Sequence, residues 1–242
     1  MRRPADATDL ASLPGVALFP LDVTDQQSVD TAVTAVVARF GRLDAVVNNA
    51  GYGLDGVFEG ADDTMIRRLF ETNVFGLMRL TRAVIPLMRK QKSGTIVQVS
   101  SMGGRATFPL YSLYHATKWA VEGFSESLAF ELRPFGIRIR LIEPGAIRTD
   151  FYHHGRERIP TPVGCGYDDL AQRCEQISVT AGRTHGSEPA VVANAILQAI
   201  MNRGWRLRYP VAAPAPRLAV LRKFLPEAFF LWLIRLRYGI RG

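Results

Sequence analysis

Runs of consecutive apolar residues recur along the chain, and each run ends in polar residues or glycine. Where β-branched residues are frequent and turn residues bound the run, this pattern predicts a strand that is buried on both faces. We therefore expect buried strands at residues 15–21, 43–47, 95–99, 137–142 and 205–209.

The segments between these strands carry apolar residues every three or four positions, which is the period of an amphipathic helix. Helices are predicted at residues 26–40, 62–90, 112–133 and 188–201. Strands that alternate with covering helices form parallel sheets, so residues 1–242 are predicted to be a single α/β domain. The stretch 151–187 shows little periodicity, and we interpret it as a substrate flap over a pocket.

Composition narrows the class of protein. Of the 242 residues, 48% are hydrophobic and 21% are charged, which is typical of a soluble globular protein and not of a disordered one. The formal net charge of +8 lies in residues 203–242, which hold nine lysines and arginines and one acid, Glu227. No nucleic-acid-binding motif accompanies this charge. Cys165 and Cys174 fit neither a disulfide framework nor a metal site, and no signal segment is seen, so a cytoplasmic protein without metal is expected.

The most informative stretch is 94–118, where a predicted strand runs into Ser100 and Ser101 and a predicted helix then carries Tyr114 and Lys118. A spacing of four places Tyr114 and Lys118 on one helix face. A nearby ammonium group favours the phenolate and lowers the pKa of a phenol from about 10. A tyrosine tuned in this way can exchange a proton with an alcohol near neutral pH. Taken alone, the pattern is short and common and favours a surface tyrosine beside a solvated lysine.

Further motifs stand at the ends of the predicted strands. They are Asp22-Val23, Asn48-Asn49-Ala50-Gly51 and Pro144-Gly145, and Ser101 comes thirteen residues before Tyr114. Together with Tyr114 and Lys118, these motifs resemble the short-chain dehydrogenase/reductase family, in particular its hydroxysteroid and retinol dehydrogenase branch. The resemblance spans roughly residues 10 to 210. It implies a Rossmann-like doubly wound parallel sheet and an NAD(P)-dependent oxidoreductase.

The resemblance also implies roles for the matching residues. Tyr114 would be the general acid/base, and Lys118 would lower its pKa and bind the nicotinamide ribose. Ser101 would hold the substrate oxygen, and Asn73 would anchor a water molecule in a proton relay. The residues implied to bind the cofactor are Asp22, Val23, Asn49, Ala50, Gly51, Tyr114, Lys118, Pro144, Gly145, Ile147 and Thr149. NADP(H) is favoured over NAD(H), because Arg2 and Arg3 stand where the family holds the 2′-phosphate of NADP.

One part of the family pattern is missing. The family begins with a strand, a Gly-rich TGxxxGxG turn and a helix, and no such motif precedes residue 15. The turn binds pyrophosphate, and its strand is central in the sheet. We therefore expect a sheet that lacks its first βαβ portion and an N-terminally truncated chain that binds NADP(H) poorly. A non-catalytic remnant is the alternative to an active enzyme.

Residues 211–242 form an apolar, basic C-terminal extension. The apolar stretch 224–238 is too short to span a bilayer, which needs about 20 residues. The flanking arginines suit a helix at residues 217–238 that lies on an anionic membrane surface, and the same pattern fits a helix that closes the pocket or packs on another subunit. The expected substrate is an apolar alcohol or ketone of steroid, retinoid or acyl type. The resemblance implies a homodimer or homotetramer formed through the helices at 62–90 and 112–133.

Overall fold

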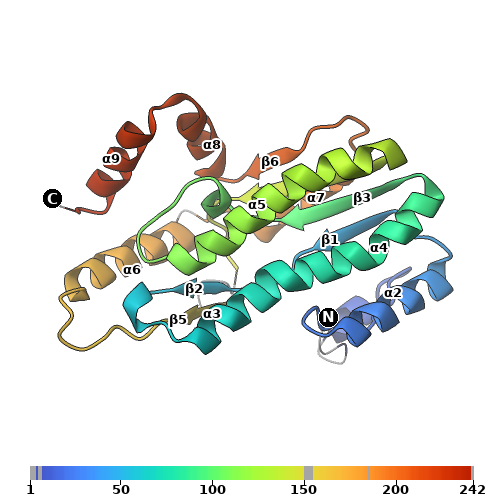
Figure 1. Ribbon diagram of the computed structural model, residues 1–242, viewed down its shortest axis with the longest axis horizontal. Helices are drawn as coiled ribbons and strands as arrows, with labels where there is room; N and C mark the ends of the chain where they lie inside the picture. Colours follow the sequence, from blue (N-terminus) through green and yellow to red (C-terminus); the bar gives the residue numbers. More distant parts are fainter. Residues whose placement is uncertain (1–3, 5–6, 150–154, 185, 241–242) are drawn as a thin grey trace.

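A four-stranded parallel sheet in the order β1-β3-β4-β6 forms the centre of the computed structural model (Figure 1). The structure describes all residues except 1–3, 5–6, 150–154, 185 and 241–242. The strands are β1 (Ala45–Asn48), β3 (Gly94–Val99), β4 (Ile137–Pro144) and β6 (Arg208–Val211). They confirm four of the predicted strands, although the last begins three residues later than expected.

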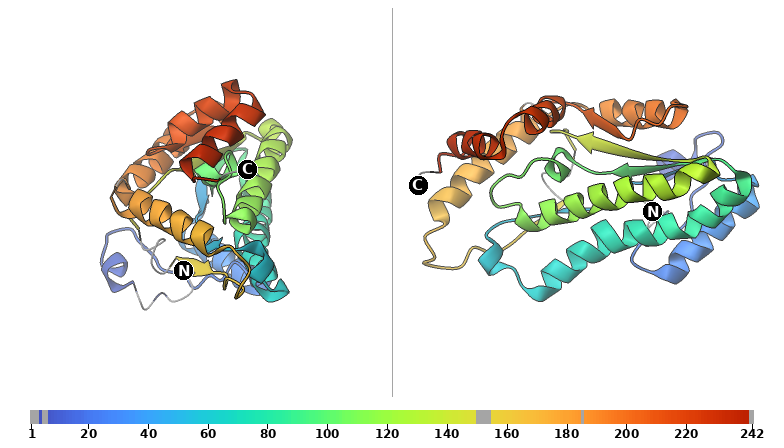
Figure 2. Two further views of the ribbon diagram at one scale, coloured as in Figure 1. Left: turned by 90° about the vertical axis from the view of Figure 1, so that its left-hand side faces the viewer. Right: turned by 45° about the horizontal axis from the view of Figure 1, so that its top comes forward.

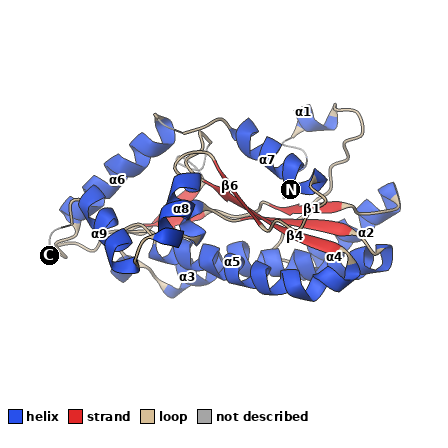
Figure 3. Cartoon of the chain, turned by 90° about the horizontal axis from the view of Figure 1, so that it is seen from above, coloured by secondary structure: helices blue, strands red, loops and turns tan. Residues whose placement is uncertain are grey.

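Helices cover both faces of this sheet. Figure 3 shows α4 (Leu77–Gln91) and α5 (Ser112–Leu132) on one face and α7 (Pro189–Met201) on the other, and α2 (Gln26–Phe40) packs against α4. The core on the α4–α5 side is built from Val29, Leu80, Val84, Met88, Ile96, Leu128, Leu132, Ile137 and Ile139. The core on the α7 side contains Val97, Ile142, Ala199, Tyr209 and Val211. This three-layer arrangement confirms the predicted Rossmann-like α/β class.

The helix boundaries follow local sequence signals. The Asp25 carboxylate accepts a hydrogen bond from the backbone N–H of Gln27 at 2.9 Å and caps α2, which ends where Gly41 adopts a φ of 76°. The shorter elements are α1 (Thr8–Ala11), η2 (Phe58–Gly60), η4 (Met102–Gly104) and η5 (Arg133–Phe135).

The expected strand at residues 15–21 is wrong. These residues run as an irregular segment, and β1 is the edge of the sheet on that side within the described residues. A strand needs a partner for its backbone N–H and C=O groups, and the neighbours that the family pattern places between residues 15–21 and β1 are absent from the described structure. Whether the chain is a truncated one stays a prediction.

The predicted helix at 62–90 is interrupted. It consists of α3 (Asp63–Phe70), a π-helical segment (Glu71–Gly76) and α4. Gly76 lies so close to Val23 that a Cβ there would come within 2.7 Å of the Val23 Cγ2 atom. A π segment inside a longer helix is rare and is often found at a functional site.

The interpretation of 151–187 as a substrate flap stays a prediction, and residues 150–154, which include His153 and His154, lie outside the described residues. The described part of the stretch is more regular than its weak periodicity indicates. β5 (Arg156–Arg158) pairs in parallel with β2 (Gly53–Asp55), and α6 (Asp168–Arg183) follows. The side chain of Arg156 is buried and pairs with Asp55 on β2 and with Glu175 on α6, at N–O distances of 3.4 and 3.0 Å. This long-range ion-pair network, which sequence periodicity does not record, fixes α6.

The C-terminal extension forms two helices, α8 (Ala215–Phe224) and α9 (Glu227–Arg237), which are separated at Leu225 and Pro226. Figure 2 shows that α9 comes near α6 and the loop that leads into α5. On α9, Phe230 is buried, whereas Trp232 and Leu236 are exposed. Among the described residues, no helix combines the length and apolar character of a transmembrane segment.

A buried arginine joins the last elements of the sheet. Arg140 on β4 donates hydrogen bonds to the carbonyl oxygens of Ala199, Asn202, Gly204 and Arg206 at distances of 2.6 to 3.0 Å. These carbonyl groups belong to the last turn of α7 and to the segment between α7 and β6. The guanidinium group therefore provides hydrogen bonds for backbone acceptors that would otherwise be buried without a partner.

Candidate active site

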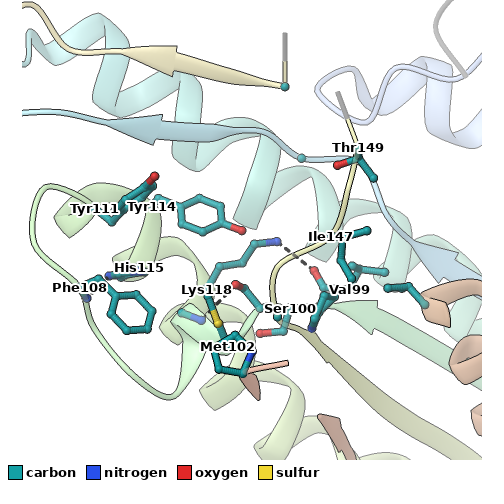
Figure 4. Close-up of a pocket in the computed structure, with 18 of the residues that line it drawn as sticks. Val99, Ser100, Met102, Phe108, Tyr111, Tyr114, His115, Lys118, Ile147 and Thr149 are labelled. Atoms are coloured by element: carbon teal, nitrogen blue, oxygen red, sulfur yellow. Dashed lines mark hydrogen bonds between the residues drawn. The ribbon is translucent and has the colours of Figure 1, made fainter. Parts of the chain in front are cut away.

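A cavity of about 1090 Å³ opens at the carboxyl ends of β1, β3 and β4 (Figure 4). This is where ligands bind in open α/β sheets. The predicted site residues that line the cavity are Asn49, Gly51, Ser101, Tyr114, Lys118, Pro144, Gly145, Ile147 and Thr149. Residues that are far apart in the sequence are thus brought into one site, as the motifs predicted.

Tyr114 and Lys118 project from the first two turns of α5 into this cavity (Figure 4). The Lys118 Nζ atom lies 5.7 Å from the centre of the Tyr114 ring and donates a hydrogen bond to the carbonyl oxygen of Val99 at 2.9 Å. Burial lowers the pKa of Lys118 to about 8, and the carboxylate of Glu122, one turn further along α5, opposes this shift. Lys118 is therefore largely protonated at neutral pH, and its positive charge lies beside Tyr114.

Ser101 is oriented by its own loop. Its Oγ atom accepts a hydrogen bond from the backbone N–H of Gly103 at 3.0 Å. A hydroxyl that accepts from the backbone keeps its own hydrogen for donation. Ser101 can therefore donate to an oxygen atom in the cavity.

The Asn73 side chain uses both of its N–H donors and one acceptor position of its oxygen. Its Nδ2 atom donates to the carbonyl oxygen of Tyr52 at 2.9 Å and to Thr117 Oγ1 at 3.2 Å, and its Oδ1 atom accepts from the Tyr52 N–H at 3.0 Å. A Cβ on Gly51 would lie 3.0 Å from this Oδ1 atom, so the loop needs glycine there. Asn73 thus joins the loop after β1 to the π segment.

Three predicted cofactor residues do not line the cavity: Asp22, Val23 and Ala50. The Asp22 carboxylate accepts hydrogen bonds from the N–H and the hydroxyl of Thr24 at 2.9 and 2.7 Å, and the Val23 carbonyl accepts one from Arg79 at 2.7 Å. Arg2 and Arg3 lie outside the described residues. The cofactor roles of these five residues stay predictions.

The arrangement agrees with a comparison against known families. The sequence profile described as short chain dehydrogenase matches residues 5–159, which is more than half of the chain. The chain belongs to the short-chain dehydrogenase family. Its members are oxidoreductases that depend on a nicotinamide cofactor, and this holds for the present chain.

Similar curated proteins support the assignment to the short-chain dehydrogenases. An uncharacterized oxidoreductase of Schizosaccharomyces pombe is 35% identical over 243 residues, which cover 99% of this chain and 100% of the relative. A 3-ketodihydrosphingosine reductase of Bacteroides thetaiotaomicron is 33% identical over 93% of this chain and 84% of its own length. A retinol dehydrogenase of Bos taurus is 37% identical over 74% of this chain and 59% of its own length.

Solved structures show the same fold. A short-chain dehydrogenase from Streptomyces avermitilis matches with a TM-score of 0.83 and 35% identity, over 100% of this chain and 88% of that one. ElxO with NADP bound is 26% identical with a TM-score of 0.63, over 79% of this chain and 73% of its own. A 3-ketoacyl-(acyl-carrier-protein) reductase from Brucella melitensis in complex with NADH is 26% identical with a TM-score of 0.67, over 86% and 82%. The neighbours thus include structures with NADP bound and with NADH bound.

The residues of this short-chain dehydrogenase fit the nicotinamide end of such a cofactor. Asn49, Ile147 and Thr149 line the cavity together with the buried Lys118, whose ammonium group is a hydrogen-bond donor of the kind that a ribose hydroxyl can accept from. The printed sequence contains no TGxxxGxG turn for the pyrophosphate. The fit therefore rests on the nicotinamide side of the site.

Sequence reasoning missed His115. Its ring is buried between Phe108, with ring centres 5.5 Å apart, and Tyr111, on which it stacks at 5.6 Å. Burial lowers the pKa of His115 to about 4, so the imidazole is neutral, and its Nδ1 atom accepts from the Phe108 N–H at 3.3 Å. His115 shapes the aromatic wall of the cavity, a role that no short sequence pattern signals.

A buried carboxyl pair lies beneath the site. Glu122 on α5 and Glu143 on β4 are 4% and 1% exposed, and Arg208 contacts them with its Nε atom at 3.0 and 3.4 Å. Burial, helped by the charge of Glu122, raises the pKa of Glu143 to about 7, and Arg105 and Arg208 oppose the shift. Glu143 precedes the cavity residue Pro144 on β4, and Glu122 follows the cavity residue Lys118 by one turn on α5. The contacts of Arg208 with both carboxylates therefore connect β4 to α5 next to the cavity.

Proposed function

We propose that this short-chain dehydrogenase transfers a hydride between NADP(H) and an apolar alcohol or ketone, with Tyr114 as the general acid/base. The observation that carries the proposal is the convergence of the Tyr114 phenol, the Ser101 hydroxyl and the buried Lys118 ammonium group on one apolar cavity. The non-catalytic remnant is less favoured, because a remnant has no need of a buried, charged lysine beside a tyrosine.

The chain's own residues would handle the proton. In the reducing direction the Tyr114 hydroxyl donates its proton to the carbonyl oxygen, and in the oxidising direction the phenolate takes the proton of the alcohol. Ser101 donates a hydrogen bond to the same oxygen and fixes its position. Lys118 stabilises the phenolate by its positive charge. The cofactor, when bound, supplies or accepts the hydride.

The walls of the cavity favour an apolar substrate. Phe108, Leu218 and Ile234 line the cavity, and so does Tyr52. Leu54 does not line it but belongs to a buried apolar cluster against which Tyr52 packs. A mostly apolar pocket with a few polar groups at one end orients a ligand by those groups. Steroid, retinoid and acyl-type ketones all meet this requirement.

The test is turnover of a ketone panel with NADPH and with NADH. We expect reduction of at least one apolar ketone, with NADPH favoured over NADH. Absence of turnover with every ketone and both cofactors, in a protein that melts cooperatively, would favour the remnant.

We also propose that residues 217–238 contact an anionic membrane surface. Phe224, Phe229, Trp232 and Leu236 are exposed on α8 and α9, and arginines flank them. Exposed apolar and basic side chains together suit an anionic interface. Sedimentation with phosphatidylserine vesicles is expected to remove more protein from solution than sedimentation with phosphatidylcholine vesicles, and equal sedimentation would contradict the proposal.

A homodimer or homotetramer through 62–90 and 112–133 stays a prediction. The exposed aromatic residues Phe75, Trp119 and Phe130 on these segments support it. Light scattering of the purified protein decides between a monomer and an assembly.

A further inference from the structure

The charged residues that line the cavity are all cations. Among the described residues that line it, Lys118 and Arg237 carry a charge, and none is an aspartate or a glutamate. Lys118 is accounted for by its place beside Tyr114. Arg237, in the last turn of α9, has no role in the chemistry proposed above.

Arg237 lies at the far end of an aromatic wall. From Tyr114, the rings of His115, Phe108 and Tyr238 follow one another, with centre-to-centre distances of 6.0, 5.5 and 6.4 Å. Leu218 and Ile234 add aliphatic surface on the same side. An apolar surface therefore separates the proposed reaction centre from the Arg237 guanidinium group.

The charge of Arg237 is not neutralised within the described part of the chain. On the preceding helix, Arg222 pairs with Glu227 at 2.7 Å, but no salt bridge in the described structure includes Arg237. A second arginine adds to the charge, because Arg173 of α6 approaches the residue after Tyr238, with its Nε atom 3.8 Å from where a Cβ on Gly239 would stand. Arg173 does not itself line the cavity, so at this end the described lining presents the charge of Arg237 with no carboxylate beside it.

We propose that Arg237, with Arg173 nearby, binds an anionic group at the distal end of the substrate. The substrate is then an amphiphile, in which an apolar chain separates the ketone or alcohol from a carboxylate or a phosphate. This inference rests on the proposed function and narrows its substrate class from apolar ketones in general to anionic acyl-type ketones. A guanidinium group binds a carboxylate and a phosphate in the same way, through paired N–H donors.

The experiment compares Arg237→Gln with Arg235→Gln, a matched control on the same helix whose exposed side chain does not line the cavity. The probes are medium-chain oxo acids with the ketone at increasing distance from the carboxylate, their neutral methyl esters, and 3-oxoacyl-coenzyme A thioesters. In Arg237→Gln we expect KM for an anionic probe to rise about three- to tenfold. The substitution removes the charge of an exposed ion pair, while the glutamine amide can still donate a hydrogen bond. KM for the methyl ester of the same chain should change less than about twofold, Arg237→Lys should recover part of the loss, and Arg235→Gln should leave both values unchanged.

The results separate the two anions and test the salt dependence. An effect confined to the oxo acids identifies a carboxylate, and one confined to the thioesters identifies a phosphate. Added salt should raise KM for the anionic probe in the wild type more than in Arg237→Gln, because ions screen an exposed charge pair. The proposal would be overturned if Arg237→Gln raised KM equally for the oxo acids and their methyl esters, or left KM unchanged for every anionic probe.

A binding measurement distinguishes failure of this site from failure of the proposed reaction. Dodecanoate has no ketone, so its binding by calorimetry does not depend on turnover. Weaker dodecanoate binding in Arg237→Gln, without turnover of any ketone, would support the anion site and reject the redox function. Turnover of ketones with equal dodecanoate affinity in the wild type and in Arg237→Gln would reject the anion site alone.

Discussion

Tyr114→Phe is expected to lower kcat by about 10²- to 10⁴-fold, which is the usual contribution of one general acid/base. The substitution removes the hydroxyl and leaves the ring, so the aromatic contacts with Tyr111 and His115, at 6.4 and 6.0 Å between ring centres, remain available. The melting temperature should therefore change little. The measurement is steady-state reduction of the best ketone of the panel, with thermal melts of both proteins.

Tyr111→Phe serves as the matched control. Tyr111 lines the same cavity, but its hydroxyl group is bound to Ser178 at 2.8 Å and lies 3.2 Å from Arg156. Its loss should lower kcat far less than the loss of the Tyr114 hydroxyl. Near-full activity in Tyr114→Phe, or equal losses in the two variants, would show that Tyr114 does not transfer the proton.

The sequence predicted those parts of the fold and site that local patterns encode. The apolar runs became the strands β1, β3 and β4, and their polar ends brought Asn49, Ser101 and Gly145 to one cavity, because parallel strands end at the same edge of a sheet. The i,i+4 spacing of Tyr114 and Lys118 needed nothing more than one helix.

The failures depend on contacts between distant residues. The segment at 15–21 has strand-like residues but no neighbouring strand in the described structure, and a strand forms only with a partner. The ordering of α6 depends on the buried Arg156 and its partners on two other elements. The role of Asn73 as a water anchor stays a prediction, and the bonds of its side chain to the backbone of Tyr52 are a long-range contact that a sequence pattern cannot show.

Lys118→Met should abolish most of the activity and yet raise stability at neutral pH. Without the ammonium group, the Tyr114 phenolate loses its stabilising charge, so residual alcohol oxidation should move its pH optimum upward. The affinity for the cofactor should fall in the same variant, since the family resemblance assigns Lys118 to the nicotinamide ribose. The pH profile of kcat/KM and a titration with NADPH measure these two effects, and an unchanged profile with normal affinity would exclude Lys118 from the site.

The stability effect follows from the pKa of Lys118. Burial lowers this pKa to about 8 from an ordinary value of 10.5, which means that burying the charged ammonium group destabilises the folded state. The unfolded chain binds more protons than the folded one between these values, so the penalty is complete below pH 8, shrinks as the pH rises, and disappears above 10.5. Methionine keeps the length and apolar character of the side chain without the charge. We expect the free energy of unfolding of Lys118→Met to exceed that of the wild type by about 1–3 kcal/mol at pH 7. The lost attraction to Glu122 and the lost hydrogen bond to Val99 act in the opposite direction and reduce this gain.

Denaturant unfolding of both proteins at pH 7, 9 and 10.5 measures this difference in the free energy of unfolding. The difference should be largest at pH 7 and should narrow at each step, because the wild type gains stability as its lysine loses the proton. Arg235→Gln, which removes an exposed charge, is the control and should show no such narrowing. A stability difference that is absent at pH 7, or that grows with pH, would mean that Lys118 is not held as a desolvated cation. The proposed support of the Tyr114 phenolate by that charge would then fail as well.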